Sequence, residues 1–436
     1  MRAALERYFQ FQELGTSWRT EILAGVTTFV TMAYIIFVNP AILSQTGMPI
    51  AAVTIATCLC AAFGSILMGA MARYPLALAP GMGLNAYFTY TVCLKMGVPW
   101  QTALGAVFLS GIIFLLLTLG GIRQLLISAI PRELHAAVAG GIGLFIAFIG
   151  LRNAGIIVSD PATMVTLGNL RAPQTALSLF GLILIAVLQV LRVRASILIG
   201  IVGTMLTGFV FHQVQWHPGH ASLAAIRQTA FHLDIAGALK LSGFEIIFVF
   251  LFVDLFDNIG TLLAVTQKTG LIPASGVIPR VQRIFFADAI STVAGSLAGT
   301  STVCSYIESS AGVAAGGRSG ITAITTGLLF FASIFVAPLV GAIPVSATSP
   351  ALIIVGALML GSIGELDWHD PMVSIPAFLT LITIPLTYSI ATGLGFGVIA
   401  FAALRLFSGK ARTSDWLLYL LAAVFLIRFI YLAAGS

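Results

Sequence analysis

The sequence predicts an all-α polytopic membrane protein with fourteen membrane-spanning segments, arranged as two sets of seven in an inverted repeat. Of its 436 residues, 59% are hydrophobic and only 8% are charged, whereas a soluble domain carries about 25% charged residues. The apolar residues recur in blocks long enough to cross a hydrocarbon core about 30 Å thick. Basic residues gather between alternate blocks, as they do on the cytoplasmic side of membrane proteins.

This composition excludes a soluble globular protein, a nucleic-acid binder and a disordered chain. The net charge of +6 lies in loops between apolar blocks, where it sets topology rather than binding a polyanion. The sequence contains no metal-protease, Walker or dinucleotide-binding motif and no hydrolase triad order. We therefore expect no catalytic residues, no metal and no cofactor.

Residues 1–21 are amphipathic and are expected to lie along the cytoplasmic surface. The polar stretch 213–242 separates the two sets of spans and is expected to be an extracytoplasmic loop. The first set is predicted near residues 22–43, 51–72, 76–94, 101–120, 135–151, 175–191 and 195–212. The second set is predicted near residues 243–267, 284–298, 301–316, 319–338, 349–363, 371–386 and 389–407.

With the N-terminus inside, fifteen of the 21 basic residues fall on the cytoplasmic side and five on the outer side, with Arg428 left uncounted. This bias agrees with the positive-inside rule and predicts a multi-pass protein of the cytoplasmic (inner) membrane with both termini in the cytoplasm. We expect residues 409–436 to form an interfacial helix, because Arg428 is costly at mid-membrane. A fifteenth span over residues 416–433 is the alternative.

Residues 110–131 and 326–344 have similar patterns, because each is the fourth span of its set and runs into an Ile-Pro pair. An odd number of spans per repeat places the two copies in opposite orientations. This is the inverted-repeat plan of secondary transporters.

The third span of each set is interrupted. In the first set, Pro80, Gly81 and Gly83 precede the polar Asn85, and in the second set residues 298–320 are rich in Thr, Ser and Gly. Irregular backbone must be buried in protein or line a cavity within a membrane. A matched pair of interrupted spans indicates a substrate site, although tight packing of a Gly-rich helix is an alternative.

Four carboxylates lie within apolar segments of the sequence. Because a charge inside a membrane is energetically costly, a functional role is the default hypothesis for them. Asp254 and Asp257 share one helical face, which Thr261 extends by a turn. Two buried anions one turn apart repel each other, so this face suits a group that carries a proton. Glu308 lies in the irregular tenth span before a short helix. Asp288 is interpreted as a helix cap or a cytoplasmic ion-pair partner.

Four segments, residues 20–43, 78–88, 252–262 and 299–320, resemble the purine-base permeases of the AzgA-like group. This group belongs to the nucleobase cation symporter-2, or nucleobase–ascorbate, superfamily. The resemblance extends from the N-terminal region to about residue 408, and its motifs are long and specific.

The resemblance implies the fold of the uracil transporter, with short antiparallel strands in the third and tenth spans that bracket the substrate. It further implies a core domain formed by residues 22–120 and 243–338. A gate domain would comprise residues 121–212 and 339–408, and a homodimer through this domain is the assembly that the resemblance suggests. Alternating access would occur by an elevator-type motion.

The family's carboxylates of the eighth and tenth spans correspond to Asp257 and Glu308, and the purine branch's amide of the third span corresponds to Asn85. Asp254 matches a further acidic position of that branch. Uracil-type members carry a histidine where this chain has Thr261, so a histidine-assisted proton step does not carry over. The predicted substrate-binding residues are Glu308, Asp257, Asn85, Phe88, Thr261 and Ser305, and the predicted proton-coupling residues are Asp257 and Asp254.

The expected partners are a purine base and the lipid bilayer. Guanine presents two adjacent N–H donors, N1–H and the 2-amino group, which a carboxylate such as Glu308 accepts bidentately, and hypoxanthine presents the N1–H donor of that edge, which adenine lacks. Phe88 or Tyr87 could stack on the ring. Guanine and hypoxanthine are therefore favoured over adenine, with a proton as coupling ion and sodium as its alternative. A sulfate or bicarbonate transporter of the same architecture is the rival, which two acidic groups disfavour because they would repel an anion.

Overall fold

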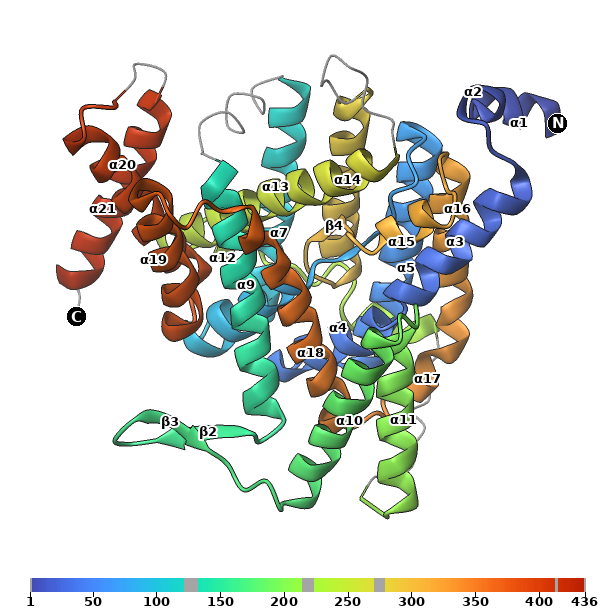
Figure 1. Cartoon of the computed structure of the whole chain (residues 1–436), viewed down its shortest axis with the longest axis horizontal. Helices are drawn as coiled ribbons and strands as arrows, with labels where there is room; N and C mark the ends of the chain where they lie inside the picture. Colours follow the sequence, from blue (N-terminus) through green and yellow to red (C-terminus); the bar gives the residue numbers. More distant parts are fainter. Residues whose placement is uncertain (1, 121–131, 214–222, 270–278, 412–414, 435–436) are drawn as a thin grey trace. The chain divides into compact units, whose positions relative to one another are not determined.

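The computed structural model describes residues 2–120, 132–213, 223–269, 279–411 and 415–434 (Figure 1). Up to the central loop, its elements in chain order are α1 (Arg2–Tyr8), α2 (Phe11–Leu14), α3 (Trp18–Met32), α4 (Ile35–Leu43), the 3₁₀ turn η1 (Ser44–Thr46), α5 (Ile50–Leu67), the π-helical η2 (Met68–Ala72), β1 (Leu78–Pro80), α6 (Met82–Ala86), the π-helical η3 (Tyr87–Lys95), α7 (Trp100–Leu119), α9 (Arg132–Asn153), β2 (Ile157–Asp160), β3 (Met164–Leu167), α10 (Pro173–Val190) and α11 (Ser196–Val210).

The central loop and the second set of spans follow. Their elements are η4 (Leu223–Gln228), α12 (Ile235–Ala238), α13 (Leu241–Thr269), α14 (Val281–Ala298), β4 (Val303–Ser305), α15 (Ser309–Ala314), α16 (Gly320–Ala332), η5 (Ser333–Val336), α17 (Ala337–Val340), α18 (Val345–Met359), η6 (Leu360–Glu365), α19 (Pro371–Thr387), α20 (Ile390–Phe407) and α21 (Trp416–Ala434).

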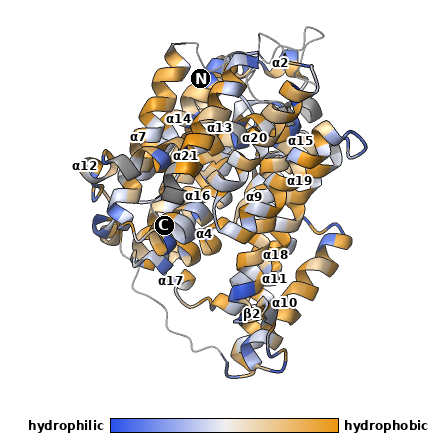
Figure 2. Cartoon of the chain, turned by 90° about the vertical axis from the view of Figure 1, so that its left-hand side faces the viewer, coloured by the Kyte–Doolittle hydropathy of each residue, from blue (hydrophilic) through white to orange (hydrophobic). Residues whose placement is uncertain are grey.

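Each of the fourteen predicted spans corresponds to a helix or to an interrupted strand–helix element, so the predicted fold class is confirmed. Within the described residues, seven helices are long and apolar enough to cross a membrane, and four shorter apolar helices accompany them. Figure 2 shows that hydrophobic residues make up most of the helices. Large apolar side chains such as Phe335 and Phe407 are exposed, which suits a lipid environment better than water.

The chain divides into two compact units. The first comprises Met1–Leu116 and Gly150–Ile354, and the second comprises Leu117–Ile149 and Val355–Ser436. The predicted core and gate domains have different boundaries, and that division stays a prediction. The predicted site residues all belong to the first unit.

In the first unit, α3, α5, α15 and α16 lie side by side (Figure 1). Small residues allow this close approach. A Cβ atom on Gly312 of α15 would lie 2.0 Å from the Thr28 hydroxyl oxygen of α3, and a Cβ atom on Gly25 would lie 2.5 Å from Thr325 of α16. Membrane helices, which lack a hydrophobic driving force between them, depend on such packing.

Helix α3 begins at Trp18, four residues before the predicted start of the first span, and is interrupted after Met32. Ala33 and Tyr34 form a turn before α4 begins, and the first bonds of α4 connect residues three positions apart. Pro40 then lies inside α4, where it removes a backbone donor. This interruption, which the sequence analysis missed, places the Tyr34 side chain in the interior.

Glu21 is a fully buried carboxylate near the start of α3. It accepts hydrogen bonds from the backbone N–H groups of Arg318 (2.9 Å) and Ser319 (3.2 Å) and from the Thr322 hydroxyl (2.6 Å). These groups precede and open α16, where a carboxylate satisfies donors that lack intrahelical partners. Glu21 therefore ties the first span to the start of the eleventh.

The second unit is built on α19 and α20, which pack against each other as a helical hairpin. Tyr388 takes a positive φ of 51° at the turn, and the Ser389 side chain caps α20. The core around α9 contains Ala136, Ala137, Leu366 and Ala377. Helix α21 packs on α20, with Phe425 buried beside Gly395. The interfacial position of α21 stays a prediction, with a fifteenth span as its alternative.

A second strand pair, which follows α9 and precedes α10 along the chain, was not predicted (Figure 1). Strands β2 and β3 form an antiparallel hairpin whose side chains are largely exposed. Asp160 closes its turn by accepting hydrogen bonds from the backbone N–H groups of Ala162 and Thr163, both at 2.8 Å. This hairpin contains none of the predicted site residues.

Candidate substrate-binding site

The interrupted third and tenth spans meet as a two-stranded antiparallel sheet. Leu78 pairs with Ser305, Ala79 with Cys304, and Pro80 with Val303, so the predicted strands in these spans are confirmed. All six residues are buried. Each strand is followed by a short helix, α6 after β1 and α15 after β4.

Side chains from neighbouring helices complete the backbone hydrogen bonding of this small sheet. The Ser65 hydroxyl of α5 accepts from the Leu78 N–H at 2.9 Å, and the Thr292 hydroxyl of α14 donates to the Val303 carbonyl at 2.9 Å. Non-helical backbone is tolerated at membrane depth only where its polar groups are paired within the protein. These bonds explain how a strand pair persists inside a helical membrane protein.

Glu308 lies immediately before α15 and is half-buried. The buried Tyr34 hydroxyl donates a hydrogen bond of 2.6 Å to Glu308 Oε1. A hydrogen bond to a carboxylate is of the strong, charge-assisted kind. The interruption between α3 and α4 thus supplies a donor that orients the carboxylate of the tenth span.

Asp257 lies on α13, is half-buried, and accepts a hydrogen bond from Cys304 Sγ of β4 at 3.1 Å. Helix α13, which carries Asp257, packs against β4 and against α15, the short helix that Glu308 immediately precedes. The structure therefore brings these two predicted residues together beside strand β4. Cys304, which was not among the predicted site residues, links Asp257 to the strand.

Asn85 of α6 is fully buried on the other interrupted span. Its Oδ1 accepts a hydrogen bond from the Ser301 hydroxyl, which precedes β4. Its Nδ2 has no hydrogen-bond partner among the described residues. A buried amide with an unused donor can bind a ligand acceptor, since leaving the donor unpaired costs about 1–3 kcal/mol.

The remaining predicted residues surround these groups. Phe88 is fully buried and its ring lies 6.4 Å from that of Phe250, so it packs within the protein. Tyr87 makes an edge contact with the same Phe250 ring at 5.1 Å. Thr261 is 6% exposed and Ser305 is 3% exposed.

Asp254 belongs to a hydrogen-bonded cluster that contacts strand β4 at Ser305. Asn258 donates to Asp254 Oδ1 at 2.9 Å and to Asp288 Oδ2 at 2.6 Å, and its Oδ1 accepts from the Ser305 N–H at 2.9 Å. The interpretation of Asp288 as a helix cap is wrong, because α14 begins at Val281 and places Asp288 two turns inside the helix. This bridge by Asn258 was not predicted from the sequence.

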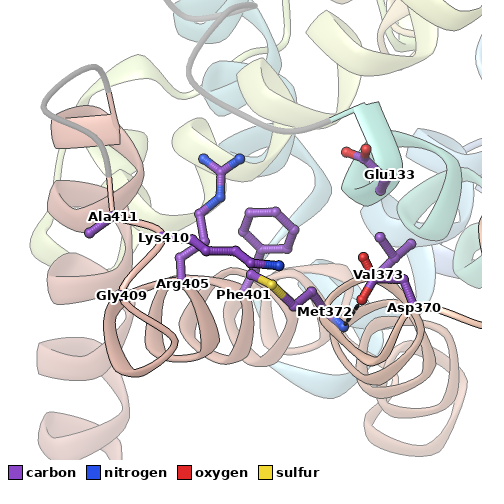
Figure 3. Close-up of a pocket in the computed structure, with 9 residues that line it drawn as sticks. All are labelled: Glu133, Asp370, Met372, Val373, Phe401, Arg405, Gly409, Lys410 and Ala411. Atoms are coloured by element: carbon purple, nitrogen blue, oxygen red, sulfur yellow. Dashed lines mark hydrogen bonds between the residues drawn. The ribbon is translucent and has the colours of Figure 1, made fainter.

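A separate cavity of about 480 Å³ lies within the second unit (Figure 3). The basic Arg405 and Lys410 line it together with the acidic Glu133 and Asp370 and the ring of Phe401 (Figure 3). Arg405 is paired with Asp415 at 2.7 Å. None of the predicted site residues lines this cavity. Within the described residues, no group of three or more His, Cys, Asp or Glu side chains is arranged to hold a metal ion.

A polytopic helical fold in which two interrupted spans pair with each other, with carboxylates beside them, is typical of a membrane transporter. The model of the Permease family labelled Xan_ur_permease matches residues 19–396. The chain therefore belongs to this permease family, the nucleobase–ascorbate transporter family that the sequence resemblance indicated. Its members are transporters and not enzymes.

Several relatives match almost the whole chain. The guanine/hypoxanthine permease PbuG of Bacillus subtilis is 48% identical over 98% of this chain and 100% of its own length. The adenine permease AdeP of Escherichia coli K12 is 43% identical over 99% of this chain and 97% of its own length. Among solved structures, the transmembrane domain of the bicarbonate transporter BicA from a cyanobacterium has a TM-score of 0.66, 15% identity, and coverage of 88% of this chain and 98% of that one. That last likeness concerns the fold alone.

Proposed function

We propose that this protein imports purine nucleobases across the cytoplasmic membrane by proton symport, with guanine and hypoxanthine favoured and adenine possible. Relatives that are 48% and 43% identical are named guanine/hypoxanthine and adenine permeases, respectively, which supports this substrate class. Alternating access would proceed by an elevator-type motion with both termini in the cytoplasm. A homodimer through the gate domain stays a prediction.

The arrangement of Glu308, Asp257 and Asn85 around the β1–β4 strand pair carries this proposal. Two carboxyl groups supply acceptors for the adjacent N–H donors of guanine, and the unused amide N–H of Asn85 supplies a donor for a purine acceptor such as O6. Tyr34 donates a hydrogen bond to one oxygen of Glu308, and Cys304 donates one to one oxygen of Asp257. Each carboxylate keeps acceptor capacity for a base, because its two oxygens offer about four lone-pair sites.

Uptake of labelled hypoxanthine into proteoliposomes that contain the purified protein tests this proposal. We expect unlabelled guanine to compete strongly, adenine to compete more weakly, and a protonophore to reduce accumulation. Failure of every purine to compete would refute purine transport.

An anion transporter is the second candidate, because the fold resembles that of a bicarbonate transporter. Asp257 and Glu308 oppose it, since two carboxylates beside the strand pair would repel an anion. The same assay separates the candidates if sulfate and bicarbonate are added as competitors. Competition by these anions and not by guanine would favour the anion transporter.

A further inference from the structure

The amide orientation of Asn258 follows from its surroundings. The residue is 2% exposed on α13, and its Oδ1 accepts from the backbone N–H of Ser305 at 2.9 Å. A backbone N–H can only donate, so this bond identifies the side-chain atom that faces strand β4 as the oxygen. The Asn258 NH₂ group must therefore face the opposite way, toward Asp254 and Asp288.

On that side, Asn258 Nδ2 lies within hydrogen-bond distance of three oxygens. These are the Asp254 backbone carbonyl at 2.9 Å, Asp254 Oδ1 at 2.9 Å and Asp288 Oδ2 at 2.6 Å. An NH₂ group has only two hydrogens, so the acceptors compete for it. The two carboxyl oxygens also lie close together, because both are in contact with the same nitrogen.

Protonation changes this competition. Two ionised carboxylates that share one amide repel each other strongly in a buried site. A proton on either carboxyl group removes the repulsion and converts one acceptor into a donor. The share of the Asn258 hydrogens that each carboxyl group receives therefore depends on whether a proton is present.

The other end of the Asn258 amide transmits this change to the candidate substrate site. Ser305, which Asn258 holds, is adjacent in β4 to Cys304, whose thiol donates to Asp257. Glu308 follows three residues later in the chain. A single side chain thus connects a buried carboxylate pair to the strand beside which both predicted purine-binding carboxylates lie.

We propose that Asn258 is a positioning residue through which the protonation of Asp254 and Asp288 acts on strand β4, which makes Asp288 part of the proton-coupling machinery. This inference rests on the proposed function. The titratable groups that surround the bridge are Asp254 and Asp257 of α13, Asp288 of α14 and Cys304 of β4, with Tyr34, Tyr306 and Glu308 beyond them.

The test is the pH dependence of the KM for hypoxanthine in proteoliposomes. If one proton must bind before the base, the wild-type KM should rise by up to about tenfold per pH unit on the alkaline side. Asn258→Ala and Asp288→Asn should each flatten this dependence. The double variant should be no flatter than either single variant, since residues that act through one another are not additive.

Asn39→Ala is the matched control. Asn39 is also a fully buried asparagine of the first unit, and it donates to the hydroxyl groups of Thr57 (2.7 Å) and Thr300 (3.1 Å). Its loss should keep the wild-type pH dependence of KM, whatever it does to the yield of folded protein. If Asn258→Ala does not fold, Asp288→Asn alone decides, because the proposal requires it to alter the pH profile.

The outcomes separate the two proposals. A wild-type protein that takes up no purine at any pH would refute the proposed function. Purine uptake with a wild-type KM that is independent of pH would overturn only the inference about Asn258, as would variants that retain the wild-type pH slope. A merely structural Asn258 would lower the maximal rate or the folded fraction and leave that slope unchanged.

Discussion

The Tyr34 hydroxyl donates a hydrogen bond of 2.6 Å to Glu308, across 274 positions of the sequence. It joins the interrupted first span to the interrupted tenth span, directly beside the β1–β4 strand pair. Because Tyr34 occupies one carboxylate oxygen, it orients the other oxygen without neutralising the group. The bond therefore makes the carboxylate predicted to bind substrate a fixed feature of the site.

Replacement of Tyr34 tests this role. Tyr34→Phe should raise the KM for hypoxanthine roughly tenfold or more, because a hydrogen bond to a charged group contributes about 1.5–3 kcal/mol. Tyr74→Phe is the control, since the Tyr74 hydroxyl donates to the Pro279 carbonyl at 3.1 Å, away from the predicted site residues. Equal KM values for Tyr34→Phe and the wild type would show that the bond does not position Glu308 for the substrate.

The thiol of Cys304 should matter as a hydrogen-bond donor to Asp257. Cys304→Ser keeps a donor at this position and should keep uptake close to the wild-type level. Cys304→Val has similar bulk and no donor, so its KM should rise by about fivefold, the equivalent of roughly 1 kcal/mol. If the Val and Ser variants transport equally well, the contact is packing alone.

The close approach of α3 and α15 should make Gly312 sensitive to any side chain. Gly312→Ala would place a Cβ atom 2.0 Å from the Thr28 hydroxyl oxygen and 2.7 Å from the Ala24 carbonyl oxygen. We expect a loss of about 1–3 kcal/mol, as for other overpacked interiors, measured as a lower Tm of the purified protein in detergent.

Gly260→Ala serves as the control for that prediction. A Cβ atom at Gly260 of α13 would meet nothing within 4 Å, and alanine favours a helix over glycine by about 1 kcal/mol. Its Tm should therefore equal or exceed that of the wild type. A Gly312→Ala protein with an unchanged Tm would contradict the packing described for α3 and α15.

Asp234, in the loop that precedes α13, should give this loop an acid-sensitive stability. Its pKa is lowered mainly by the backbone N–H of Gly237 and then by the Thr102 hydroxyl, which donate to it at 2.9 Å and 3.0 Å. Because the folded-state pKa lies below the unfolded one, the stabilisation is present above the unfolded value and is lost as the pH falls through the folded value.

Amide hydrogen exchange of the short helix α12 measures this effect. At neutral pH the wild type should protect the Gly237 amide better than Asp234→Asn does, and the difference should disappear in acid. Comparison of the two proteins at each pH removes the intrinsic pH dependence of exchange. A difference that persists in acid would show that the charge on Asp234 is not its cause.

Local patterns in the sequence were sufficient for much of the architecture. Apolar block length predicted the positions of the helices, and Pro80, Gly81 and Gly83 predicted the interruption of the third span. The strand pairing itself came from the resemblance to a family and not from the residues, because three-residue strands have no periodicity to detect. The interruption before Tyr34 was missed, since neither Ala33 nor Tyr34 is a helix breaker.

The sequence alone predicted membrane insertion, the order of the spans and membership of the family. It also allowed Asp254, Asp257 and Glu308 to be selected, because a charge in an apolar segment is costly. Their partners depended on the tertiary structure: Tyr34 for Glu308, Cys304 for Asp257, and Asn258 between Asp254 and Asp288. The physical reason is that burial cost is a property of one residue in its local segment. A hydrogen bond between distant spans exists only once helix packing has brought its donor and acceptor within about 3 Å.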